Sequence, residues 1–139
     1  MQEENRKKVP VTLLVIDDDR EMLAILKDFL EQEGYRVIAE LSGDNAIATV
    51  ELERIDLVIL DKEMPGMNGL DFLSFLRHRF PQTPVIFITA FGGPHVAEEA
   101  IRRGASRYLE KPFRVTDLLS AVRAMTEAGK RLSSSCASG

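Results

Sequence analysis

Cysteine is nearly absent from this chain of 139 residues, because Cys136, in a serine-rich stretch near the end, is the only one. A single cysteine excludes an internal disulfide and a cysteine-based metal site, and it favours a reduced, cytoplasmic setting. Apolar runs of the roughly 18 residues that a membrane-spanning helix needs are missing. The first eight residues are polar and charged, so no signal-peptide pattern opens the chain.

Clusters of basic residues are also missing. Lys and Arg number 18 against 22 Asp and Glu, which gives a formal net charge of −4. Surfaces that bind nucleic acid or anionic membranes gather Lys and Arg, so the composition argues against both kinds of partner. The remaining composition, 45% apolar and 29% charged, is ordinary for a globular protein, and the length fits one domain with its own core.

Short apolar runs alternate with segments of helical periodicity along the whole chain. Strands are predicted at 11–16, 35–39, 55–60, 84–89 and 106–110, and helices at 19–34, 42–50, 68–80, 92–104 and 115–125. Asp19 is predicted to be the N-cap of the first helix, and Leu73, Leu76 and Phe80 are expected on the inner face of the third. Five such pairs predict an α/β fold, a three-layer, doubly wound parallel sheet with helices on both faces. The fifth run is the least apolar and is predicted to be an edge strand. We expect a mobile lead at 1–10, one domain at 11–128, and a serine-rich tail or linker at 129–139.

Asp61 ends the most distinctive of these runs. The apolar residues 57–60 precede it, and Pro65-Gly66 prevents the strand from continuing. A short apolar run of this kind is typical of a strand buried on both faces of a parallel sheet. Asp61 is therefore predicted at the carboxyl end of a central strand, where ligands collect in open α/β sheets.

Polar side chains follow the other strands in the same way. Asp17 and Asp18 follow the first strand, Thr89 ends the fourth, and Lys111 follows the fifth. If the strand order is 2-1-3-4-5, the carboxylates of Asp17, Asp18 and Asp61 share one pocket. Such crowding is unfavourable, because two unit charges about 4 Å apart repel by roughly 4 kcal/mol at an effective dielectric of 20. Either one carboxyl takes up a proton or a hard divalent cation binds. The oxygen donors favour Mg²⁺ (or Mn²⁺), and no His or Cys lies at these strand ends to favour zinc.

A carboxylate, a metal, an ammonium and a hydroxyl together suit a phosphoryl group. Asp61 would be the nucleophile, since an aspartyl carboxylate can form an acyl phosphate. The motifs at residues 15–19, 60–69, 88–90 and 111–113 then carry a family resemblance: VIDDD, LDKEMPGMNG, ITA and KPF resemble the receiver domain of bacterial two-component response regulators over residues 11–128. The strand order 2-1-3-4-5 of this flavodoxin-like, receiver-like fold comes from that resemblance.

The resemblance also implies a signalling switch that catalyses only its own phosphotransfer and slow autodephosphorylation. It implies that Asp61 accepts a phosphoryl group from a phosphohistidine on a sensor histidine kinase or phosphotransfer protein. Asp17, Asp18, Asp61 and the backbone carbonyl of Glu63 would hold the Mg²⁺, and Lys111 would contact the acyl phosphate.

A second group of implied residues reports the phosphate. Thr89 and Ala90 would bind and sense it, Tyr108 is in the position of the switch aromatic, and the Lys111-Pro112 peptide is expected to be cis. The fourth helix, fifth strand and fifth helix would form the switching face, which binds an output domain or effector, or a second copy in a phosphorylation-dependent homodimer.

Glu63 and Phe91 depart from the family's commonest patterns. Glu63 places a negative charge close to the acceptor, and the bulky Phe91 is two residues after Thr89. Both would affect the access of water to the phosphoryl group, and we hypothesise slow self-hydrolysis.

Two other functions are compatible with parts of the pattern. Asp17-Asp18-Asp19 contains the Asp-x-Asp of haloacid-dehalogenase phosphatases, but position 21 is Glu where that family has Thr or Val, and the length leaves no room for a cap domain. In such an enzyme Asp17 would carry the phosphate. A dinucleotide-binding domain is disfavoured because no G-x-G-x-x-G follows the first strand.

Overall fold

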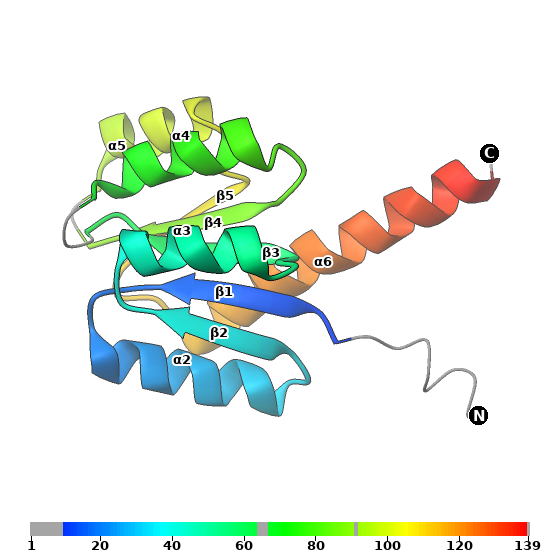
Figure 1. Ribbon diagram of the computed structural model, residues 1–139, viewed down its shortest axis with the longest axis horizontal. Coiled ribbons are helices and arrows are strands. Elements are labelled where there is room, and N and C mark those ends of the chain that lie inside the picture. Colours follow the sequence, from blue (N-terminus) through cyan, green and yellow to red (C-terminus); the bar gives the residue numbers. More distant parts are fainter. Residues whose placement is uncertain (1–9, 64–66, 91, 139) are drawn as a thin grey trace.

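A computed structural model describes residues 10–63, 67–90 and 92–138, with side chains as far as residue 126. The elements alternate from strand to helix (Figure 1). In chain order they are β1 (Thr12–Ile16), α2 (Arg20–Gln32), β2 (Arg36–Glu40), α3 (Gly43–Leu52), β3 (Leu57–Asp61), α4 (Gly69–Arg79), β4 (Val85–Thr89), α5 (Pro94–Arg102), β5 (Arg107–Glu110) and α6 (Val115–Ser138).

The five strands form one parallel sheet in the order β2-β1-β3-β4-β5, which confirms the predicted fold class and strand order. β1, β3 and β4 are buried along their whole lengths, and β5 lies at an edge, as its lower apolar content predicted. Ile16 pairs with Leu60, so the residues after them, Asp17 and Asp61, are brought side by side.

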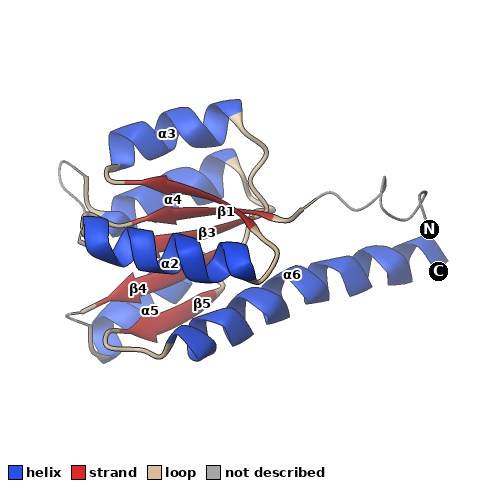
Figure 2. Cartoon of the chain, turned by 90° about the horizontal axis from the view of Figure 1, so that it is seen from below, coloured by secondary structure: helices blue, strands red, loops and turns tan. Residues whose placement is uncertain are grey.

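Helices cover both faces of the sheet and enclose two cores (Figures 1 and 2). Alternate residues of each central strand point to opposite faces, because side chains in a strand have a period of two. On one face, α2 and α6 pack against Leu13, Val15 and their equivalents in β3 and β4. On the other face, α3, α4 and α5 pack against Leu14, Ile16 and their equivalents.

Local capping explains where the helices begin. The side chain of Asp19 accepts hydrogen bonds from the N–H groups of Glu21 and Met22, which confirms its predicted role as N-cap. Ser42 and Asn68 cap α3 and α4 in the same way. Asp19 and Ser42 lie within three residues of the ends of β1 and β2, so short capped turns connect these strands to their helices.

Two details of the helices differ from the predictions. Phe72 is completely buried in α4, whereas Phe80, expected on the inner face, is the partly buried C-cap. The backbone of α6 continues as helix to Ser138, past residue 128 where the domain was expected to end, and Figure 1 shows it projecting beyond the sheet. The expected lead at 1–10 lies almost entirely outside the described residues, and the assignment of 129–139 to a tail or linker stays a prediction. Within the described part of the chain, no helix is both long and apolar enough to cross a bilayer.

Candidate functional site

The carboxyl edge of the sheet gathers the predicted site residues. Asp61 is the last residue of β3 and Asp17 follows β1, and these carboxyls are only 3% and 4% exposed. Thr89, the last residue of β4, is completely buried. Lys111 follows β5 directly after Glu110. Residues separated by up to 94 positions in the sequence therefore meet in one place.

Lys111 connects the two buried carboxylates. Its Nζ lies 3.2 Å from Asp17 Oδ2 and 3.3 Å from Asp61 Oδ2. The remaining oxygens of both acids accept backbone hydrogen bonds, from Asp19 N at 3.0 Å to Asp17 and from Glu63 N at 3.3 Å to Asp61. Each carboxyl is thus oriented at both oxygens, at one by Lys111 and at the other by a backbone N–H.

The electrostatic balance at Asp61 remains unfavourable to a negative charge. Burial raises the pKa of its carboxyl to about 7, and the charge of Asp17 adds to this rise, while Lys111 and the Glu63 N–H act against it. Burial alone would lower the pKa of Lys111, but the charges of Asp61 and Asp17 outweigh it, so that pKa is raised. One ammonium therefore does not compensate fully for two buried carboxylates.

The site has the donor set of a hard divalent cation. Asp17, Asp18 and Asp61 each offer a carboxylate oxygen, and these oxygens lie within 4.8 Å of one another. Asp18 is exposed, so solvent reaches the cluster from that side. All-oxygen ligands and surplus negative charge suit Mg²⁺ or Mn²⁺.

Thr89 and Glu63 are in direct contact. The hydroxyl of Thr89 donates to Glu63 Oε2 at 3.1 Å and lies 3.4 Å from Oε1. Lys62 Nζ lies 3.5 Å from the same Oε2. The sequence did not predict this contact. It follows from the pairing of β3 with β4, in which Asp61 lies opposite Ile88, so the chain just beyond Asp61 runs beside Thr89.

Two glycines at this edge were also missed. A Cβ on Gly69 would lie 2.6 Å from Lys62 Cα, so only glycine lets the start of α4 pack on the chain just after Asp61. A Cβ on Gly92 would lie 1.8 Å from the hydroxyl oxygen of Tyr108 and 3.0 Å from Thr89 Cγ2. A Cβ is excluded at Gly69, where the neighbouring atoms are backbone, whereas at Gly92 the Tyr108 side chain would have to shift. The sequence motifs contained both glycines but did not indicate these contacts.

Tyr108, the predicted switch aromatic, is half-buried on β5. Its ring stacks on Phe87 of β4 with centroids 6.5 Å apart, and its hydroxyl donates to Glu110 Oε1 at 3.4 Å. Ala90 is exposed next to Thr89, and the Lys111-Pro112 peptide is cis as expected. Phe91, the other predicted tuning residue, lies outside the described residues.

Comparison with known families agrees with this geometry. The family model described as "Response regulator receiver domain" matches residues 13–123, which is most of the chain. The chain belongs to the response regulator receiver domain family.

Curated relatives of this receiver domain are longer proteins. The transcriptional regulatory protein CpxR of Escherichia coli strain K12 is 42% identical over 113 residues, which are 81% of this chain and 48% of CpxR. The response regulator protein FleR of Pseudomonas aeruginosa is 40% identical over 110 residues, 79% of this chain and 23% of FleR. The chain thus spans half or less of the length of these relatives.

Solved receiver structures match the fold closely. The CheY-like response regulator receiver domain protein of Methanospirillum hungatei superposes with a TM-score of 0.85 and 26% identity, over 88% of this chain and 98% of that one. The receiver domain of the Francisella response regulator 1452 gives a TM-score of 0.82 and 27% identity, over 86% and 98%. This protein is therefore a receiver-type signalling switch in fold and family.

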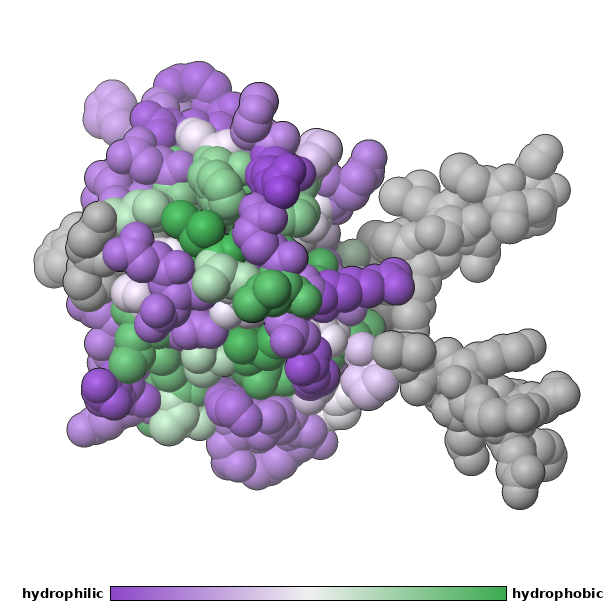
Figure 3. All heavy atoms as spheres, viewed as in Figure 1, coloured by the Kyte–Doolittle hydropathy of each residue, from purple (hydrophilic) through white to green (hydrophobic). Residues whose placement is uncertain are grey.

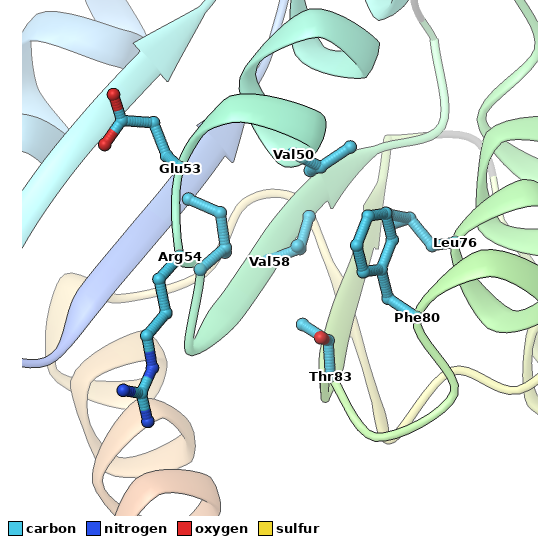
Figure 4. A pocket seen from close by; sticks show the side chains of 8 residues that line it. Val50, Glu53, Arg54, Val58, Leu76, Phe80 and Thr83 are labelled. Carbon is cyan, nitrogen blue, oxygen red and sulfur yellow. The ribbon is translucent and has the colours of Figure 1, made fainter.

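Described residues of the receiver domain line at least two hollows. One, of about 410 Å³, adjoins the site and is lined by Met22, Ile25, Leu26, Ala90, Lys111, Pro112, Phe113 and Val115. The other, of about 220 Å³, lies at the amino ends of β3 and β4, away from Asp61. Figure 4 shows Val50, Val58, Leu76 and Phe80 around it, with the charged ends of Glu53 and Arg54 pointing away. Figure 3 shows the molecule from the same side as Figure 1. Apolar residues gather in the middle of the face turned to the viewer, and polar residues surround them.

Proposed function

We propose that this receiver domain accepts a phosphoryl group on Asp61 from the phosphohistidine of a sensor histidine kinase or phosphotransfer protein. The observation that carries the proposal is the convergence of the Asp17, Asp18 and Asp61 carboxylates at one sheet edge, where Lys111 contacts both Asp17 and Asp61. Family membership supports the same chemistry.

The transfer requires an ionised Asp61. One carboxylate oxygen attacks phosphorus, the phosphorus–nitrogen bond of the donor breaks, and the imidazole nitrogen leaves with the bonding electron pair. The new oxygen–phosphorus bond is an acyl phosphate. Lys111, now 3.3 Å from Asp61 Oδ2, is placed to donate to a phosphoryl oxygen, and Thr89 is the hydroxyl donor on the neighbouring strand.

Asp17, Asp18, Asp61 and the backbone carbonyl of Glu63 would hold the divalent cation. Mg²⁺, when bound, would supply positive charge against the phosphoryl oxygens and the crowded carboxylates. The chain's own contribution is to keep the two acids buried and oriented through Lys111 and the backbone N–H groups of Asp19 and Glu63.

The apolar hollow beside Lys111 suits a protein donor. Ile25 is 56% exposed there, which is unusual for so large an apolar side chain next to a charged site. A protein that carries a phosphohistidine can cover this surface while its imidazole reaches Asp61. A small-molecule phosphoryl donor would leave this apolar surface uncovered.

The output side lies on α5, β5 and α6. Tyr108 on β5 contacts the Gly92 turn that Thr89 also faces, so a shift of Thr89 reaches this face directly. The face would bind an output domain or effector, or a second copy after phosphorylation. Glu63, two residues after the acceptor in sequence, and Phe91, two residues after Thr89, would keep self-hydrolysis slow.

Incubation with acetyl phosphate and Mg²⁺, followed by intact-mass measurement, tests the acceptor. The wild-type protein should gain one phosphoryl group, and Asp61→Asn should gain none. Asp44→Asn, an exposed acid in the first turn of α3, is a matched control that should behave as wild type. Labelling of Asp17 rather than Asp61 would favour the haloacid-dehalogenase chemistry instead, and equal labelling of Asp61→Asn would refute the proposal.

A further inference from the structure

The backbone and the side chain of Glu63 contact two different residues of the site. Its N–H donates to the acceptor Asp61, while its carboxylate turns to Thr89 and receives the Thr89 hydroxyl hydrogen at 3.1 Å. Lys62 Nζ, at 3.5 Å, holds the same carboxylate oxygen. A carboxylate with these two partners is fixed in place, although its side chain is 37% exposed.

The Thr89 hydroxyl, which donates to Glu63, is also a donor that a phosphoryl oxygen on Asp61 would need. A threonine hydroxyl has a single hydrogen to donate. Thr89 is buried at the end of β4, beside Asp61 on β3, so its hydroxyl is the donor nearest to the phosphoryl group in the neighbouring strand. It cannot serve Glu63 and a phosphoryl oxygen fully at the same time.

We propose that Glu63 is an internal acceptor that occupies the Thr89 hydroxyl until a phosphoryl group on Asp61 takes its place. The inference rests on the proposed function, because it requires Asp61 to receive the phosphoryl group. It adds a regulatory step to that site: Glu63 raises the threshold for switching by competing for Thr89.

The displacement has a clear direction. A phosphoryl group brings a charge of about −1.5 to −2, which repels the Glu63 carboxylate. Glu63 has an open path outward, since more than a third of its side chain already faces solvent, and Lys62 can follow it. Thr89 has no such path and stays buried, so it is Glu63 that leaves.

The released Thr89 is coupled to the output strand. A Cβ on Gly92 would meet both Thr89 Cγ2 and the Tyr108 hydroxyl, so both side chains lie against this one residue. As long as Glu63 holds Thr89, the Thr89 methyl and Tyr108 keep their present packing. The Glu63–Thr89 hydrogen bond is thus an autoinhibitory contact between the chain just after β3 and the end of β4, and Tyr108 on β5 packs beside it.

Beryllofluoride with Mg²⁺, a phosphoryl mimic that needs no donor, tests the competition by isothermal titration calorimetry. Glu63→Ala should bind it about tenfold more tightly than wild type, the size of one charge-assisted hydrogen bond. Glu63→Gln, which keeps a neutral acceptor, should lie between them. Glu21→Gln, which removes an exposed acid in the first turn of α2 at the same edge, should change affinity by less than about twofold.

The decisive comparison repeats Glu63→Ala without the hydroxyl. In a Thr89→Val background, the gain from Glu63→Ala should fall below about threefold, whereas in Thr89→Ser it should be retained. In ligand-free Glu63→Ala, the NMR signals of the Thr89 methyl and Tyr108 ring should move toward those of the beryllofluoride-bound wild type. The Glu63→Ala sample is measured without metal or phosphoryl mimic, and only the wild-type reference contains them.

Each outcome separates the two proposals. An equal gain in the Val and Thr backgrounds would mean that Glu63 acts by charge alone, and it would overturn the inference while leaving the proposed function intact. Unchanged affinity of Glu63→Ala would overturn it as well. If the wild-type protein binds no beryllofluoride in the presence of Mg²⁺, the proposed function fails first, and the inference fails with it.

Discussion

Replacing Asp61 by Asn should stabilise the metal-free protein at alkaline pH. The pKa of this carboxyl is raised from 3.8 to about 7 in the folded chain, mainly by burial. Below about pH 4 the carboxyl is protonated in both the folded and the unfolded chain, so the buried group costs the folded state no free energy of ionisation. As the pH rises toward 7 the unfolded chain gains by ionising first, and above about 7 the cost to the folded state is constant.

The magnitude follows from the difference between the two pKa values. A change from 3.8 to about 7 corresponds to a ceiling of about 4 kcal/mol in the free energy of unfolding. That pKa already includes the attraction of Lys111, and an amide does not replace a protonated carboxyl perfectly, so the expected gain for Asn at pH 8 is about 2 to 4 kcal/mol. At pH 4.5 the gain should not exceed about 1 kcal/mol.

Urea denaturation followed by far-ultraviolet circular dichroism, with a chelator present, measures the effect at both pH values. Asp44→Asn serves as the control, because Asp44 is exposed and its substitution should change stability little at either pH. If Asp61→Asn is no more stable than wild type at pH 8, or gains as much at pH 4.5, the buried charge at Asp61 is not the source of strain and the electrostatic argument is wrong.

Three further outcomes are expected from the same site. Mg²⁺ at 100 times its dissociation constant should stabilise the wild-type protein by about 2.7 kcal/mol at pH 8, and Asp61→Asn much less, as thermal unfolding with and without chelator will show. Lys111→Met should cost about 1 to 3 kcal/mol at pH 8 in urea denaturation, because it leaves Asp17 and Asp61 buried without a cation, and equal stability would contradict the role of the 3.2 and 3.3 Å contacts. Gly69→Ala should cost about 1 to 3 kcal/mol, since its Cβ would lie 2.6 Å from Lys62 Cα; the same change at Gly34, where a Cβ would meet nothing but φ is +99°, separates crowding from backbone strain.

Much of the fold could be predicted because its signals are local. Apolar runs bounded by turn residues located every strand to within two residues, and Asp19 was recognised as a cap from its position before a periodic segment. Phe72 was missed because a residue next to the predicted helical stripe is buried only when α4 packs closely on the sheet. The helical backbone beyond residue 128 was missed because a serine-rich composition favours a linker.

The sequence by itself determined which chemical groups stand at the strand ends: Asp17, Asp18, Asp61, Thr89 and Lys111 each follow or close an apolar run. Strand alternation, a property of neighbouring residues, was sufficient for that. Only the tertiary structure decided what those groups touch. The register between β3 and β4 brings Glu63 to Thr89, and the close approach of the backbone after β3 leaves no room for a Cβ at Gly69. Such contacts depend on distances between segments far apart in the chain, which no local pattern encodes.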